Sequence, residues 1–111
     1  MIGHNDLCLK SCFSFLDSLV SRVRVEPEDY ERNIRRALDY LSTHLPHTLV
    51  VLLSPADVTA ALAIVDKPPV CILSHTVECP CLFATHREQA VRRVKWLWQS
   101  YGSVIMSVFG S

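Results

Sequence analysis

The chain has 111 residues, the length of one small domain, and its 50% hydrophobic and 20% charged residues are typical of a folded protein. Eleven basic residues balance eleven acidic ones, which argues against a general nucleic-acid binder because such proteins need a basic surplus. No apolar run reaches the roughly 18–20 residues that cross a bilayer, and the first residues lack the pattern of a signal peptide.

The first half of the chain predicts helix and strand in alternation. Ile2 is expected to end a strand, Gly3 to Asp6 to form the turn after it, and residues 13–25 fit a helix moderately well. A clearer helix begins at Pro27, which suits a first helical position, and Pro46 ends it. Its apolar stripe is formed by Tyr30, Ile34, Leu38, Leu41 and Leu45, and its exposed side is expected to pair Glu28 with Arg32 and Glu31 with Arg35.

The second half continues this alternation. Residues 48–53 are apolar on both faces, as in an internal strand of a parallel sheet, and Ser54 with Pro55 predicts a helix start. Residues 68–81 read as irregular with a short strand at 70–73. A capping box at Thr85 and Glu88 then predicts a helix with a C-cap at Gly102, followed by a strand at 103–109. The apolar stripe of this helix is formed by Ala90, Val91, Val94, Leu97, Trp98 and Tyr101. The order predicts an α/β fold whose ligands bind beyond the carboxyl ends of strands, at residues 3–6 and 54–57.

The tetrapeptide Gly3-His4-Asn5-Asp6 carries the most chemical information. Gly allows a backbone conformation that is closed to other residues, and Asp6 can accept backbone N–H groups in a turn. The Asn5 amide can point a donor into a cleft, where it would stabilise the oxyanion of an acyl transfer by about 2.7–4 kcal/mol. The alternative is an ordinary turn without chemistry.

Four blocks in order along the chain together resemble SGNH (GDSL-type) hydrolases, in their membrane-associated phospholipase B branch. The first is Ile2 to Cys8, with its Gly-x-Asn-Asp and trailing Leu-Cys, although His4 stands where that branch often has a smaller residue. The others are residues 33–41, the Leu-Pro at 45–46 with the predicted strand at 50–52, and Cys79-Pro80-Cys81-Leu82. The resemblance covers residues 1–83 well and the remainder loosely.

This resemblance implies a three-layer, flavodoxin-like α/β fold, of which residues 1–111 would be a single partial domain. It also implies a protein that hydrolyses acyl esters of phospholipids with a Ser nucleophile and a His base, using no metal or cofactor. Asn5 matches the oxyanion-hole Asn of the family, and Gly3 the glycine before it. The expected setting is extracellular or membrane-associated, with a phospholipid substrate, contact with a membrane surface, and no nucleic acid.

The nucleophile and the base of that family have no counterpart in this chain. Nothing precedes Gly3 that resembles Gly-Asp-Ser-Leu, and no Asp is followed three residues later by His. Leu16-Asp17-Ser18-Leu19 lacks the glycine, follows the Asn block and falls in a predicted helix, so Ser18 reads as a surface residue. The chain is therefore expected to be a catalytically inactive central fragment. The alternatives are a non-catalytic interaction module, α/β or helical, that is a truncated product, and a zinc-binding module.

The cysteines and histidines leave several interpretations open. Five cysteines favour an oxidising compartment or a metal site, and they predict at least one disulfide without fixing its connectivity: Cys8, Cys12, Cys71, Cys79 and Cys81. Zinc would draw its ligands from Cys8, Cys12, His75, Cys79, Cys81 and His86, but the spacings differ from the usual Cys-x₂-Cys. The histidines at 44, 47, 75 and 86 read as cap, turn and loop residues.

The last predicted helix and the predicted sheet would each leave an unusual surface exposed. Arg87, Arg92, Arg93 and Lys95 interleave with Trp96 and Trp98, which would suit an anionic lipid surface or simply a solvated helix face. A parallel sheet of two or three strands would expose its edges and one apolar face. The isolated chain is therefore predicted to be marginally stable or to associate with itself.

Overall fold

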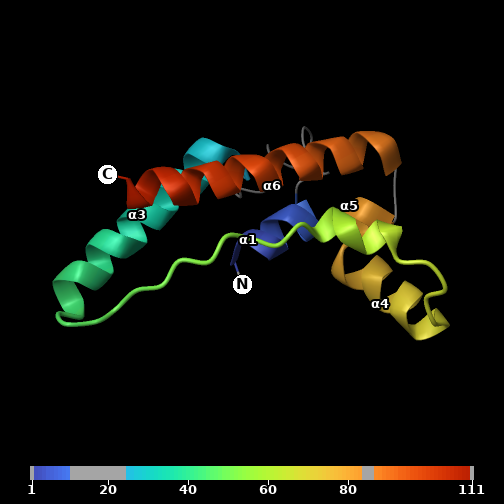
Figure 1. Ribbon diagram of the computed structural model, residues 1–111, viewed down its shortest axis with the longest axis horizontal. Coiled ribbons are helices and arrows are strands. Elements are labelled where there is room, and N and C mark those ends of the chain that lie inside the picture. The colour runs from blue at the N-terminus through green and yellow to red at the C-terminus, as the bar shows by residue number, and fades with distance from the viewer. Residues whose placement is uncertain (1, 11–24, 84–86, 111) are drawn as a thin grey trace.

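The computed structural model describes residues 2–10, 25–83 and 87–110, and every regular element in these ranges is helical (Figure 1). The predicted α/β fold with a parallel sheet is therefore wrong. The elements are α1 (Ile2–Asn5), the π-helix η1 (Asp6–Lys10), α3 (Pro27–His44), the 3₁₀-helix η2 (Val58–Ala63), α4 (Pro69–Glu78), α5 (Pro80–Phe83) and α6 (Arg87–Phe109).

Helix α6 is the longest element, and α3, α5, η1 and η2 all pack against it (Figure 1). Its buried face repeats at helical spacing through Ala90, Val94, Leu97, Tyr101 and Ile105. This stripe continues beyond Gly102, so the predicted C-cap at Gly102 and the predicted strand at 103–109 are wrong. A glycine inside a helix costs about 1 kcal/mol, and the apolar contacts made beyond it outweigh that cost.

Helix α3 begins and ends where the sequence predicts. Pro27 occupies the first turn, the helix ends at His44, and Leu45 is the C-cap before Pro46. Of the two predicted ion pairs, Glu31 bonds to Arg35 at 2.9 Å. Arg32 bonds to Asp29 at 2.5 Å instead of to Glu28, because Asp29 is equally close on the helix surface at i,i+3.

The predicted strands do not form, because a strand gains its hydrogen bonds only from a neighbouring strand. Ile2 begins α1, and residues 70–73 lie in α4, which Pro69 starts. Residues 48–53 have no regular structure, and they run as a long connection beneath α3 in Figure 1. The helix predicted from Ser54 starts later, at Val58, because the Asp57 side chain accepts the Thr59 N–H as its N-cap.

The hydrophobic core lies where η1, α5 and α6 meet. Leu7, Cys81, Leu82, Val94, Leu97 and Tyr101 are its fully buried side chains. The molecule measures 47 × 33 × 21 Å, and its radius of gyration is 15.8 Å against about 13 Å for a compact chain of this length. Within the described ranges, no helix is long and apolar enough to cross a bilayer.

Candidate functional site

Gly3 of α1 lies close to Pro55, Tyr30 and Tyr101. A Cβ added to Gly3 would lie 2.9 Å from Cγ of the buried Pro55, 3.4 Å from the Tyr30 hydroxyl and 3.6 Å from the Tyr101 ring. Its φ is not positive, and the residue is helical, so the predicted turn conformation is wrong. The structure needs glycine here for space and not for backbone freedom.

Asn5 and Asp6 face different surroundings. Asn5 ends α1 with an exposed side chain whose amide has no hydrogen-bond partner among the described residues. That amide is available as a donor to a bound group. Asp6 begins η1, is half-buried, and acts electrostatically on two tyrosines.

These two tyrosines, Tyr30 of α3 and Tyr101 of α6, form the tyrosine pair. Their rings stack in parallel with centroids 3.9 Å apart, and the Tyr101 hydroxyl donates to the Val25 carbonyl at 2.6 Å. Burial, and next the Asp6 carboxylate, raise the pKa of both phenols above the ordinary value of 10.0. The hydroxyls therefore stay protonated at neutral pH, so they can donate hydrogen bonds but cannot act as general bases.

A disulfide links Cys8 of η1 to Cys79, which directly precedes α5. It joins residues 71 positions apart, and so brings the segment after Gly3-His4-Asn5-Asp6 next to Cys79-Pro80-Cys81-Leu82. Cys81 is also disulfide-bonded, Cys71 carries a free thiol, and Cys12 lies outside the described residues. The prediction of at least one disulfide is confirmed.

The described residues contain no cluster of zinc ligands, because no three His, Cys, Asp or Glu residues lie together there in a way that could hold a metal ion. The oxidised Cys8, Cys79 and Cys81 cannot supply the thiolate that zinc requires.

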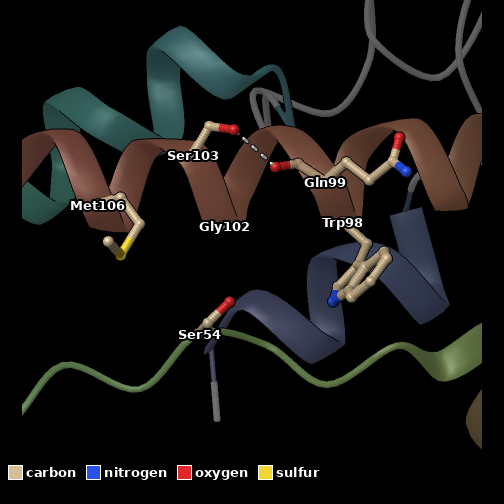
Figure 2. Close-up of a pocket in the computed structure, with 6 residues that line it drawn as sticks. All are labelled: Ser54, Trp98, Gln99, Gly102, Ser103 and Met106. Carbon is tan, nitrogen blue, oxygen red and sulfur yellow. Dashed lines mark hydrogen bonds between the residues drawn. The ribbon is translucent and has the colours of Figure 1, made fainter.

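An open groove of about 570 Å³ runs beside α6, where the 48–57 connection passes it (Figure 2). Trp98 points from α6 across the groove, and its indole N–H donates to the Pro55 carbonyl at 2.8 Å. The lining residues are Ser54, Trp98, Gln99, Gly102, Ser103 and Met106. None of them titrates near neutral pH, so the groove can bind a polar or apolar group but offers no acid or base.

Among the described residues, the histidines at 44, 47 and 75 lie apart and form no catalytic pair. His44, in the last turn of α3, stacks on Tyr40, and its Nδ1 lies 2.9 Å from the Tyr40 carbonyl oxygen. His47 adopts a left-handed φ of 65° in the turn after Pro46, and His75 lies in α4 beside the Phe83 ring. None of these three bonds to a hydroxyl or thiol in the described ranges. The side chain of His4, and the residues Ser18 and His86, lie outside what the structure describes.

In the basic, tryptophan-rich part of α6, some side chains are exposed to solvent and others point toward the core. Arg93 bonds to the Glu26 carboxylate and stacks over the exposed Trp96 ring at 4.9 Å. Arg92 and Lys95 are exposed, whereas Trp98 points inward, and the Arg87 side chain is not described. This arrangement is that of an amphipathic core helix with a solvated face.

Comparison with protein-family models, with curated proteins and with solved structures finds no match to this chain. Two contacts near Gly3 were not predicted from the sequence. These are the stacking of the tyrosine pair and the anchoring of Trp98 to Pro55. Tyr30, Tyr101 and Trp98 all fall in the predicted apolar stripes. However, the spacing of apolar residues along one helix predicts only its buried face and not which residues of another element that face contacts.

Proposed function

We propose that this chain carries the oxyanion-hole segment of a phospholipase B-like lipid ester hydrolase and performs no chemistry alone. Asn5 would donate its side-chain N–H to the oxyanion that forms when a serine attacks the ester carbonyl. The ordered series of four sequence blocks carries the proposal. The Ser nucleophile and His base must come from outside the printed sequence.

Two structural observations support this proposal. The Cys8–Cys79 disulfide links the Gly-x-Asn-Asp block to the Cys-x-Cys-Leu block. The Asn5 amide is exposed and unpaired within the described residues, as an oxyanion donor must be before substrate binds. The disulfides also fit an oxidising, extracellular setting, where a phospholipid or other acyl ester at a membrane surface would be the substrate.

The coding sequence on either side of this segment provides the first test. We expect a Gly-Asp-Ser-Leu block upstream and an Asp-x-x-His block downstream. In the protein encoded by that full reading frame, Asn5→Ala should lower kcat for phospholipid hydrolysis by about 10²–10³-fold. Asn33→Ala is the matched control, because Asn33 is the only other asparagine and is also exposed.

A fluorophosphonate probe gives a second, independent readout. The 111-residue chain should remain unlabelled, because it lacks an activated serine. Labelling of Ser18 or any other serine in this chain, or equal kcat values for the two Asn variants, would overturn the proposal.

The second candidate is a non-catalytic interaction module, and the exposed apolar surface favours it. Leu49, Val51 and Leu53 are 88%, 68% and 73% exposed, which is unusual for residues of this kind in a self-contained fold. A reading frame without codons for Gly-Asp-Ser upstream would favour this function over ester hydrolysis.

A further inference from the structure

Residues 48–53 form an extended part of the connection between α3 and η2 (Figure 1). The side chains of Leu49, Val51 and Leu53 are exposed, whereas the even-numbered side chains between them are partly buried. This period of two is that of an extended chain, whose successive side chains point to opposite sides. The segment contains neither a charged residue nor a proline.

The backbone of this segment is unpaired. In the described part of the chain, no N–H or C=O group of residues 48–53 takes part in a hydrogen bond. An extended peptide is recognised by hydrogen bonds to its backbone and by pockets that take alternate side chains, and an endopeptidase binds its substrate in this way. Residues 48–53 can therefore be bound by a protease without first breaking a hydrogen bond of the described fold.

Val51 is the best placed residue of the segment to be recognised at the cleaved bond. Its side chain is 68% exposed, and extended chain lies on both sides of it, at residues 48–50 and 52–53. The pocket for the residue before the cleaved bond sets the specificity of a serine endopeptidase, and the pocket of the elastase type is small and apolar. The short, uncharged side chain of Val51 fits such a pocket.

Other exposed valines lack this combination of features. Val70 and Val77 are 70% and 68% exposed, but both lie in α4, which must unwind before an active site can bind it. Val65 is 79% exposed and lies outside the helices, but Asp66 after it adopts a left-handed φ of 57°, and Pro68 follows. The extended, unpaired backbone, and not exposure alone, therefore distinguishes Val51.

We propose that the Val51–Leu52 peptide bond is a cleavage site for a serine endopeptidase with a small aliphatic specificity pocket. Water is the co-reactant. Its oxygen bonds to the Val51 carbonyl carbon, the C–N bond breaks, and the products are a carboxylate on Val51 and an ammonium group on Leu52. This modification does not depend on ester hydrolysis, because it uses neither Asn5 nor a serine of this chain.

The cleaved protein remains one molecule. Cys8 lies before the cleaved bond and Cys79 after it, so their disulfide joins residues 1–51 to residues 52–111. The packing of α3 and η1 against α6 and the stacking of the tyrosine pair also cross between these two pieces. The product is therefore a two-chain protein whose pieces stay bonded until the disulfide is reduced.

Brief digestion of the full, oxidised chain with pancreatic elastase tests this site. We expect the first product to gain one water molecule and a new N-terminus at Leu52. It should have the mass of one species without reductant, and it should separate into residues 1–51 and 52–111 after reduction.

Two lysine variants separate recognition of Val51 from general effects of charge. Val51→Lys would bring a charge to the apolar pocket of the protease, so it should slow this cleavage by about tenfold or more. Val77→Lys is the matched control, because Val77 is the same residue type with the same 68% exposure, and it should leave the rate unchanged. Both positions are exposed, so both variants should keep the helical circular dichroism of the parent chain.

Several results would overturn the cleavage site. A first cut at any other bond would do so, as would a chain that resists elastase until it is denatured. Equal slowing by both lysine variants, or no slowing by Val51→Lys, would contradict recognition of Val51. Separation of the pieces without reductant would contradict the two-chain product.

Discussion

Replacement of Gly3 by alanine sets two effects of opposite sign against each other. Alanine favours a helix over glycine by up to about 1 kcal/mol, which would stabilise α1. The new methyl group, however, would lie 2.9 Å from Cγ of Pro55, a distance that real Cβ contacts do not show. Pro55 is buried and its ring is rigid, so relief requires movement of α1 or of the 48–57 connection. Overpacking of this kind costs about 1–3 kcal/mol, so after the gain in helix propensity we expect a net loss of up to about 2 kcal/mol.

Gly102→Ala is the matched control for this prediction. Its Cβ would lie 3.5 Å from the Ser54 hydroxyl, an ordinary contact, and α6 is regular around it. Gly102→Ala should therefore stabilise the protein by about 1 kcal/mol, and thermal unfolding should show Tm changes of opposite sign, about 4 °C per kcal/mol. Pro55→Ala removes the clashing atom, so Gly3→Ala should cost less in that background. A Gly3→Ala protein as stable as the parent, or a cost of Gly3→Ala that is unchanged in the Pro55→Ala background, would refute the packing argument.

Three further predictions follow from single contacts. Because the phenol pKa values of the tyrosine pair are raised in the folded state, the contribution of this pair to stability should be constant below pH 10 and decrease above it, as the unfolded tyrosines ionise first. Above pH 10, the Tm should therefore fall less steeply with pH in Tyr101→Phe. Replacing both Cys8 and Cys79 by alanine opens a loop of 71 residues and leaves the disulfide of Cys81 in place. It should cost about 4 kcal/mol in urea unfolding, and a much smaller loss would contradict the loop-entropy estimate. Asp57→Ala should cost about 1 kcal/mol by removing the N-cap of η2, whereas Asp57→Asn, which keeps the acceptor, should cost less.

The proposed oxyanion role of Asn5 and the packing role of Gly3 can be tested separately. Asn5 is exposed, so Asn5→Ala should leave the unfolding free energy nearly unchanged. Gly3→Ala, in contrast, should alter stability whether or not the chain belongs to an ester hydrolase. A change in kcat without a change in Tm is therefore the signature of the Asn5 amide acting on the substrate.

Local rules predicted the helices whose ends carry strong chemical signals. Pro27 and Pro46 set the limits of α3 because proline is favoured in the first turn and excluded from the interior. The stripe from Ala90 to Tyr101 predicted the buried face of α6, since side chains three or four positions apart share one side of a helix. The cysteine count predicted a disulfide but left its partners open.

The tertiary structure decided the remaining features, because each depends on a partner distant in the sequence. Residues 48–53 have every local property of a strand, yet a strand forms only beside another, and the other predicted strands fold as helices. Gly3 resembles a turn residue in sequence, but its small size is needed only because Pro55, Tyr30 and Tyr101 meet there. The sequence alone determined the chemistry that Asn5 can offer, and the fold determined that its amide is exposed and that a disulfide ties its segment to Cys79.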